Sequence, residues 1–202
     1  MPLNNCQVLG ITGGIGSGKS IVSRVIQNMN IPVYDCDKEA KRLNETDPII
    51  REKLKMIVGS HVYSDNGLLN KSVLAEYLFK SQEHTKEINR IIHPRVREDF
   101  QEWLTTQSTS MVGIESAILF ESGFDNLADV IIQVSAPKTL RIERTIKRDH
   151  TNKQAVEQRI NKQYDDTKIK ELADYRLIND NRHPLLPQIL DILNVLLCLS
   201  PM

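Results

Sequence analysis

Glycine, lysine and serine residues near the start of the chain have the types and the spacing that phosphate binding requires. An apolar run over residues 8–11 leads into Gly13-x4-Gly18-Lys19-Ser20, and an apolar helical pattern follows. Glycines allow backbone N–H groups to wrap a polyphosphate, because no side chain intrudes and positive φ angles are tolerated. The residues that we expect at the phosphates are Gly13, Gly14, Gly16, Ser17, Gly18, Lys19, Ser20 and Ile21.

Each polar group of this loop has a chemical role in the expected site. Lys19 would neutralise the β and γ phosphates, and the Ser20 hydroxyl would bind Mg²⁺. The N-terminus of the following helix adds partial positive charge beneath the phosphates. The order of strand, loop, Lys-Ser and helix therefore predicts a nucleotide-binding protein rather than a simple strand-to-helix turn.

Two carboxylates end the next predicted strand. Residues 31–34 have the pattern of that strand, and Asp35 and Asp37 follow it. Ligands bind beyond the carboxyl ends of parallel strands, so we expect these side chains near the phosphate loop. A cap for the next helix needs only one carboxylate. We therefore expect at least one of the two aspartates to take part in the chemistry, either as a base toward an attacking hydroxyl or in ordering Mg²⁺.

A basic helix is predicted from Pro137 onward. Most of its cationic side chains, Arg141 among them, are expected to form a solvated face. Arg144 and Arg148 differ, because residues four apart share one helical face and can reach a transferring phosphoryl group together. A nucleic-acid surface would carry aromatic residues among these charges, and Tyr164 is the only one nearby.

Other polar residues are left with open roles. Glu115 and Glu121 both follow a predicted strand, and either is a candidate partner for Mg²⁺. His93 precedes Pro94 and fits a structural residue at a helix kink better than a catalytic one. The segment Asn179–Asn181 follows the last predicted strand, where it either meets the nucleotide base or forms a turn, and its composition favours the turn.

A parallel α/β sheet would bring these residues together. The alternation of strand, helix and strand at the start implies right-handed crossovers, and further buried strands are expected at 111–114, 130–134 and 174–178. Between residues 47 and 103 the pattern changes to helices alone, with His93-Pro94 expected to interrupt the last of them. The apolar segment 185–199 is too short to span a bilayer and has the pattern of a terminal helix packed on the core.

The composition limits the partners and the compartment. The 202 residues include 26 basic and 26 acidic side chains, which argues against a protein that mainly grips nucleic acid or an anionic membrane. Cys6, Cys36 and Cys198 lack the spacing of a disulfide framework or a zinc site. No export signal is recognised in the first residues. We expect a cytoplasmic protein without a nucleic-acid or membrane partner.

Taken in order, the motifs resemble those of bacterial dephospho-CoA kinases over nearly the whole chain. They are I-T-G-G-I-G-S-G-K-S (Ile11 to Ser20), Y-D-C-D (Tyr34 to Asp37), D-N-G-L-L (Asp65 to Leu69), H-P-R-V (His93 to Val96), I-L-F-E (Ile118 to Glu121), R-T-I-K-R-D (Arg144 to Asp149), Gln163 and A-D-Y-R-L-I-N-D-N (Ala173 to Asn181). The phosphate loop occurs in many families, whereas the full series is specific.

This resemblance implies a three-layer P-loop kinase fold with a central parallel sheet, a helical substrate-binding insertion and a helical lid. Residues 1–46 and 104–202 would form the nucleotide-binding core, residues 47–103 the insertion for the CoA precursor, and residues 137–165 the lid. The implied reaction is ATP-dependent phosphorylation of the ribose 3′-hydroxyl of dephospho-CoA, the last step of coenzyme A biosynthesis, with Mg²⁺. We expect a monomer or a weak homo-oligomer.

The resemblance also implies roles for single residues. Asp37 matches the general base, with Asp35 in support. Arg144 and Arg148 match lid arginines that close over the phosphates and exclude water. Lys19 and its loop would hold ATP.

Three alternatives differ in class. The nearest is another P-loop kinase that acts on a small metabolite or a nucleoside monophosphate. A guanine-nucleotide switch would need an N-K-x-D segment, but the N-K pairs that begin at Asn70, Asn152 and Asn161 all lack the acidic fourth residue. A nucleic-acid-binding module is disfavoured by the balanced charge and the few aromatic residues.

Overall fold

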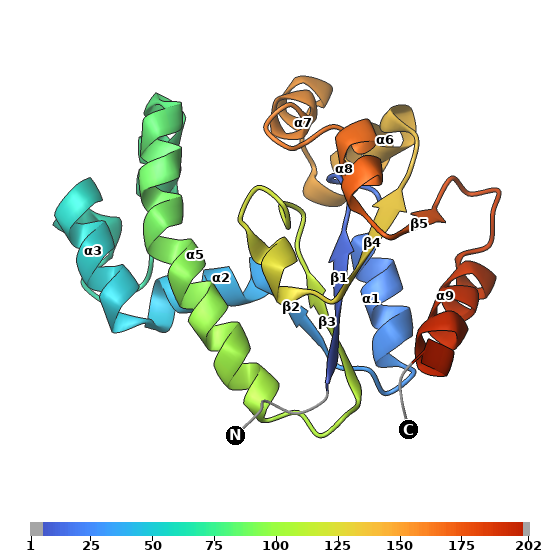
Figure 1. The fold of residues 1–202 in the computed structure, drawn as a ribbon. Helices are drawn as coiled ribbons and strands as arrows, with labels where there is room; N and C mark the ends of the chain where they lie inside the picture. Colours follow the sequence, from blue (N-terminus) through green and yellow to red (C-terminus); the bar gives the residue numbers. More distant parts are fainter. Residues whose placement is uncertain (1–5, 200–202) are drawn as a thin grey trace. The chain divides into compact units, whose positions relative to one another are not determined.

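The computed structural model describes residues 6–199, which form two compact units (Figure 1). The first comprises the described residues up to Asp35 and from Gln107 onward, and the second runs from Cys36 to Thr106. The sequence placed the start of the helical insertion at residue 47. In the structure the unit begins eleven residues earlier, because the helix that follows Asp35 packs on the later helices of the same unit.

The first unit contains a five-stranded sheet in the order β2-β3-β1-β4-β5, with every neighbouring pair parallel. This confirms the predicted parallel sheet. The strands are β1 (Gln7–Thr12), β2 (Val33–Asp35), β3 (Met111–Glu115), β4 (Val130–Ser135) and β5 (Tyr175–Ile178).

Two helices, α1 (Lys19–Gln27) and α9 (Leu185–Leu199), cover one face of this sheet (Figure 1). Leu9 and Ile11 of β1 point to that face and pack with Val22 and Ile26 of α1 in one buried cluster. Burying such a side chain contributes about 1.5–3 kcal/mol. The apolar spacing of α1 therefore fixes the helix against the strand that precedes the phosphate loop.

The other face is covered by the connection after β3. A Cβ at Gly10 of β1 would lie 3.0 Å from both Leu119 and Ala128, so this connection runs close over the sheet. Four further elements complete the described part of the unit: η2 (Phe124–Leu127), α6 (Lys138–Asp149), α7 (Lys153–Ile160) and α8 (Asp166–Leu172).

The register aligns the carboxyl ends of three strands. Ile11 of β1 is paired with Glu115 of β3, and Glu115 is paired on its other side with Asp35 of β2. Because Ile11 is followed directly by Thr12 and the phosphate loop, two carboxylates and the loop leave the sheet at the same edge.

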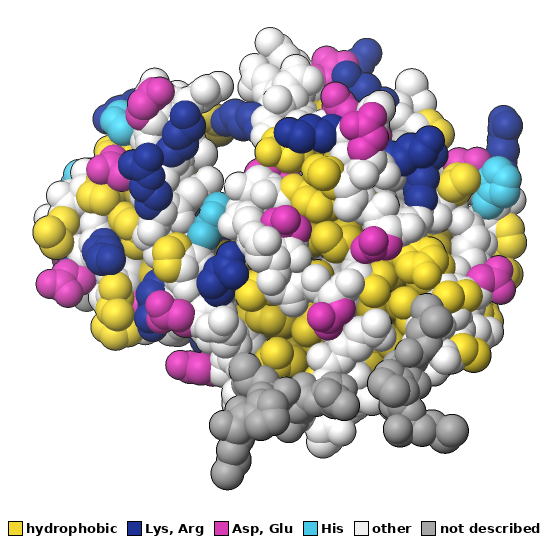
Figure 2. Space-filling view, viewed as in Figure 1, with side chains coloured by type: hydrophobic (Ala, Val, Ile, Leu, Met, Phe, Trp, Pro, Cys, Tyr) yellow, Lys and Arg dark blue, Asp and Glu magenta, His cyan; other side chains and the backbone are white. Residues whose placement is uncertain are grey.

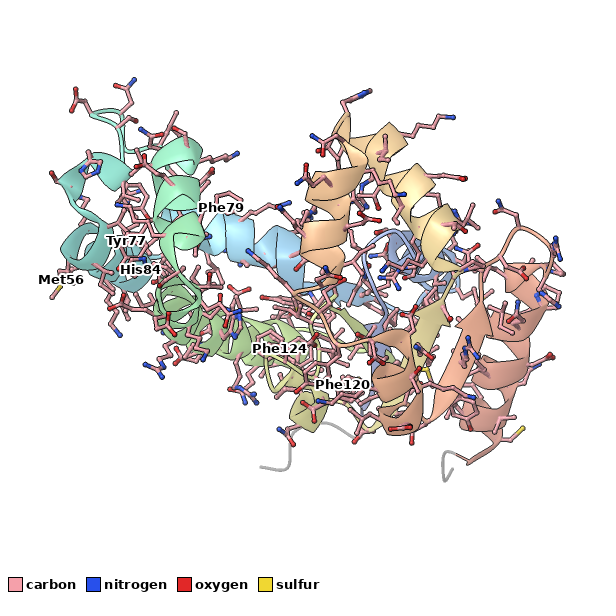
Figure 3. The ribbon with its side chains drawn as sticks, turned by 90° about the horizontal axis from the view of Figure 1, so that it is seen from above. Met56, Tyr77, Phe79, His84, Phe120 and Phe124 are labelled. Carbon is pink, nitrogen blue, oxygen red and sulfur yellow. The ribbon has the colours of Figure 1, made fainter. Side chains whose placement is uncertain are left out.

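The second unit is helical and has its own core. Its buried side chains include Ile50, Leu54, Ile88 and Phe100. Tyr77 and His84 stack with ring centroids 4.2 Å apart, which joins two of its helices (Figure 3). The elements are α2 (Cys36–Thr46), α3 (Pro48–Val58), η1 (Ser60–Val62), α4 (Lys71–Lys80) and α5 (Gln82–Thr105).

The predicted interruption at His93-Pro94 is wrong, since both residues lie inside α5, which is a continuous helix of 24 residues. Proline inside a helix costs about 3 kcal/mol because it removes an N–H donor and crowds the preceding turn. Val96 and Phe100, beyond the proline, are almost fully buried. Continued burial of this apolar face outweighs the local cost. Burial also lowers the pKa of His93, which favours its neutral form.

The surface agrees with the balanced composition. On the face drawn in Figure 2, basic and acidic side chains are interspersed. Within residues 6–199, none of the helices combines the length and the apolar character needed to cross a lipid bilayer.

Asp47 joins two helices of the second unit. Its carboxylate accepts a hydrogen bond of 2.8 Å from the Ile50 N–H as the N-cap of α3, and it pairs with Arg95 of α5 at 2.8 Å. The Asp47 side chain is 5% exposed. Burial alone would raise the pKa of Asp47, but the N–H donors and the Arg95 guanidinium together hold it below its usual value.

We expect Asp47→Asn to lower the free energy of unfolding by about 2 kcal/mol at pH 7, because Asn keeps the helix cap but loses the ion pair. The folded-state pKa of Asp47 is depressed, so its contribution is present above about pH 4 and is lost as the pH falls through the folded value. Urea unfolding at pH 7 and pH 3 measures both effects. A gap between the two proteins that does not shrink at pH 3 would contradict this account.

Candidate functional site

The phosphate loop between β1 and α1 is a folded structure held by its own groups. Lys19, 8% exposed, donates from Nζ to the Gly13 carbonyl at 2.9 Å across the loop. Ser17 N–H donates to the Gly14 carbonyl at 3.1 Å. The first amides of α1 lack intrahelical acceptors, as at any helix start, so the loop presents N–H groups at a positive helix end. This geometry suits a polyphosphate.

Side chains from elsewhere in the chain pack against two of the loop glycines, and this packing explains why glycine is needed at those positions. A Cβ at Gly14 would lie 1.8 Å from Nη2 of Arg141, so no side chain fits there. At Gly18, where φ is +102°, a Cβ would lie 2.1 Å from Nδ2 of Asn179. The glycines therefore admit buried polar side chains of the surrounding protein as well as the ligand.

Three side chains from the C-terminal part of the chain hold the loop in place. Ile15 donates its N–H to Oε1 of Gln163 at 2.9 Å, and its carbonyl accepts from Nε of Arg141 at 3.0 Å. Asn179 donates from Nδ2 to the Ser17 carbonyl at 2.7 Å. The loop is thus shaped without a bound ligand.

Gln163 also ties the loop to the segment after β3. Its Nε2 donates to the Ala117 carbonyl at 2.9 Å. Beside it, the Tyr164 N–H donates to Oε1 of Glu121 at 2.6 Å. Glu121, a candidate partner of Mg²⁺ from sequence, therefore anchors the chain after α7 in this structure.

One cavity of about 220 Å³ at the edge of the sheet is lined by the oxygen-bearing side chains of Ser20, Ser23, Gln27, Asp35 and Glu115, together with Arg24 and Val33. Ser20 Oγ donates to Oε1 of Glu115 at 3.3 Å. Burial, the largest influence, raises the pKa of Glu115 above its usual value. A cation in the cavity would favour the ionised carboxylate.

This donor set fits Mg²⁺, which prefers oxygen ligands and usually binds through one or two carboxylates together with substrate phosphates and water. Among residues 6–199, no three His, Cys, Asp or Glu side chains are grouped so that they could hold a metal by themselves. An ion here would depend on the Ser20 hydroxyl, a nearby carboxylate and a bound phosphate.

The two aspartates predicted as a pair belong to different units. Asp35 is the last residue of β2 and lines the cavity with Ser20. Asp37 lies in the first turn of α2, where an acidic side chain also interacts favourably with the helix dipole.

The arginines of α6 have different partners. Arg144 donates to the Asn179 carbonyl at 3.1 Å, to Oδ1 of Asn179 at 3.2 Å and to Oδ1 of Asn181 at 2.6 Å. Arg148 pairs with Asp149 at 2.6 Å and is 57% exposed. The structure therefore fastens Arg144 beside the loop but leaves Arg148 at the surface.

Arg141 was expected on the solvated face, and this expectation is wrong. It is 4% exposed, and its Nη1 pairs with Asp166 at 2.6 Å while Nε reaches the loop. A basic helix viewed by its charges alone does not reveal which residue faces inward. The apolar neighbour Ile142, buried on the same side, was the available signal.

Sequence reasoning also missed what the side-chain amides do. Gln163 is part of the family resemblance, but its sequence context predicts no role for it. The composition around Asn179 favours a turn. A turn does form, because Asp180 accepts from the N–H groups of Arg182 and His183. Asn179 itself is 6% exposed and faces the loop, and no local pattern signals that orientation.

Comparisons with known proteins agree with this arrangement. The family model described as dephospho-CoA kinase matches residues 7–184. A dephospho-CoA kinase of Bacteroides fragilis strain YCH46 is 47% identical over 186 residues, covering 92% of this chain and 90% of that protein. One from Porphyromonas gingivalis strain W83 is 42% identical over 186 residues, covering 92% of each.

Solved structures show the same fold. The protein TT1252 from Thermus thermophilus has a TM-score of 0.82 at 28% identity, over 98% of this chain and 99% of that one. Dephospho-CoA kinase from Campylobacter jejuni has a TM-score of 0.66 at 22% identity, over 96% of each chain, which supports the fold alone. The matched residues include the loop, the carboxylates at the strand ends and the arginines of α6, and the chain belongs to the dephospho-CoA kinase family.

Proposed function

We propose that this chain transfers the γ-phosphoryl group of ATP to the ribose 3′-hydroxyl of dephospho-CoA, giving CoA and ADP in the last step of coenzyme A biosynthesis. The observation that carries the proposal is a preformed phosphate loop whose Ser20 shares a cavity with Asp35 and Glu115, in a chain of this family. The bond from the γ-phosphorus to the β–γ bridging oxygen breaks as the ribose oxygen attacks.

ATP would lie with its phosphates in the loop. We assign the binding surface to the backbone and side chains of Gly13, Gly14, Gly16, Ser17, Gly18, Lys19, Ser20 and Ile21. Because Gln163 already engages the Ile15 N–H, the phosphates would use the amides at the start of α1. Lys19 would leave the Gly13 carbonyl for the β and γ phosphates, exchanging one acceptor for a charged one.

Mg²⁺ would be held by the Ser20 hydroxyl, with Glu115 and Asp35 as the nearest carboxylates of the same cavity. When bound, the ion supplies positive charge to the phosphate oxygens. The contribution of the chain is to orient the Ser20 hydroxyl through its hydrogen bond to Glu115.

Asp37 is our candidate for the general base, with Asp35 in support. A carboxylate can accept the ribose hydroxyl proton as the bond to phosphorus forms. The helical unit, residues 36–106, would receive dephospho-CoA, and α6 and α7 would act as the lid that excludes water. We propose small-molecule partners, without nucleic acid or a membrane, for a monomer or weak homo-oligomer in the cytoplasm.

A substrate panel tests the proposal. The purified protein is incubated with Mg²⁺ and ATP together with dephospho-CoA or each nucleoside monophosphate, and ADP release is measured. We expect turnover with dephospho-CoA. Turnover with a nucleoside monophosphate alone would refute the assignment and favour the related class of P-loop kinases.

For Asp37→Asn we expect kcat to fall by about a hundredfold or more, while the affinity for ATP changes by no more than about threefold, because a positioned base acts on the transfer step. Asp35→Asn serves as the comparison. Initial rates and calorimetric ATP binding measure the two quantities. Unchanged turnover in Asp37→Asn would remove Asp37 from the role.

Glu115→Gln should raise the Mg²⁺ concentration for half-maximal rate by about tenfold, the usual cost of losing a group that orients a metal ligand. A Mg²⁺ titration at saturating ATP and dephospho-CoA gives this value. If the Mg²⁺ requirement of the variant matched that of the parent protein, Glu115 would have no part in ordering the ion.

For Arg144→Lys we expect a larger loss in kcat than in ATP affinity, since lysine lacks the fork that reaches two oxygens at once. Arg148→Lys is the matched variant on the same helix, and its exposed position predicts a smaller loss. If Arg144→Lys changed only the KM for ATP, Arg144 would contact bound ATP and the transition state equally strongly.

A further inference from the structure

Asn179 is a junction between three parts of the chain. It stands at the end of β5, where its N–H donates to the Ser135 carbonyl at 2.8 Å. Its Nδ2 donates to the Ser17 carbonyl in the phosphate loop at 2.7 Å, and its Oδ1 accepts from Nη2 of Arg144 in α6 at 3.2 Å. The side-chain amide of Asn179 therefore links the loop to the lid helix, and its backbone N–H ties it to the sheet edge.

A side-chain amide can make both contacts, whereas a carboxylate or an ammonium group cannot. Arginine carries hydrogen-bond donors and no acceptor, whereas a backbone carbonyl only accepts. The group between Arg144 and Ser17 must therefore accept on one side and donate on the other. Both Asn179 and Ser17 are buried, at 6% and 1% exposure, so the geometry is shielded from water.

Arg144 is held by neutral oxygens. Its three contacts are the Asn179 carbonyl, Oδ1 of Asn179 and Oδ1 of Asn181, and within residues 6–199 no carboxylate forms an ion pair with it. The other two arginines of α6 differ, since Arg141 pairs with Asp166 and Arg148 with Asp149.

The acidic residue between the two asparagines is directed elsewhere. Asp180 accepts from the N–H groups of Arg182 and His183 and lies 3.0 Å from the His183 ring. Amide oxygens thus fix the direction of the Arg144 guanidinium without neutralising it. Its positive charge stays available to an anion at the loop.

We infer that Asn179 is a positioning residue for phosphoryl transfer: it fixes Arg144 relative to the phosphate loop and acts on the reaction through Arg144. This inference rests on the proposed function, because it assigns Arg144 to the transferring group. Asn179 itself need not touch either substrate.

A double-mutant cycle tests the inference. The variants are Asn179→Ala, Arg144→Ala and the two combined. In the parent protein we expect Arg144→Ala to lower kcat by about a hundredfold. In the Asn179→Ala background the same change should cost less than about fivefold, because Arg144 has already lost its position. Equal losses in the two backgrounds would show a merely structural role for Asn179 and overturn the inference.

Two further variants control the experiment. Asn126 is an exposed asparagine whose Nδ2 donates to the Gly123 carbonyl, away from the loop, and Asn126→Ala should leave kcat within about twofold. If Asn179→Ala is too unstable to purify, Asn179→Asp replaces it in the cycle. That variant keeps the volume but sets an oxygen against the Ser17 carbonyl and a negative charge beside Arg144, so it should also lower the cost of Arg144→Ala.

The same cycle on Mg²⁺–ATP affinity, measured by calorimetry, separates this inference from the substrate assignment. Arg144→Ala should weaken binding by about fivefold in the parent protein and by less than about twofold with Asn179→Ala present. A protein that shows this coupling but does not phosphorylate dephospho-CoA would refute the substrate and retain the positioning role. An Arg144→Ala variant with unchanged kcat and unchanged affinity would overturn the inference outright.

Discussion

The phosphate loop can work only if a glycine-rich backbone is held in one conformation. Glycine loses more conformational freedom on ordering than any other residue, and an unrestrained loop would have to lose that freedom on binding ATP. Here the restraint comes from hydrogen bonds to Ile15 and Ser17 made by Gln163, Arg141 and Asn179. Arg141 and Asn179 also fill the spaces beside Gly14 and Gly18, so the loop and its supports are one packed structure.

The tertiary packing also gives the arginines of α6 different partners. Three arginines on one helix have two kinds of partner, since Arg141 and Arg148 pair with carboxylates and Arg144 contacts amide oxygens. A paired arginine has already satisfied its charge, whereas one held by neutral acceptors can still attract an anion. The choice of partner, rather than the presence of arginine, distinguishes a structural cation from a candidate functional one.

The carboxylates follow the same logic at the sheet edge. Parallel register places Glu115 next to Asp35, and α1 brings Ser20 to Glu115. Burial and the neighbouring Asp35 disfavour the charged form of Glu115, and Lys19 and the Ser20 and Ser23 hydroxyls offset this in part. The cluster becomes more favourable when a positive ion and its phosphates are present, which gives this edge of the sheet a physical reason to bind both.

The sequence by itself determined the features that depend on neighbours along the chain. The loop spacing, the strands around it and the terminal helix at 185–199 all follow from local preferences and periodicity, and the structure contains them. The same reasoning failed at Pro94, because the local cost of proline was outweighed by burial of residues that only the folded unit brings together.

What only the tertiary structure decided is the set of contacts made across long stretches of chain. Arg141, Gln163 and Asn179 reach the loop from 126, 148 and 162 residues away in sequence. Hydrogen bonds and ion pairs act over a few ångströms in space and leave no periodic trace in the residues beside them. The sequence therefore identified the loop that would bind the phosphates. The fold decided which side chains hold that loop, and which arginine of α6 contacts amide oxygens instead of a carboxylate.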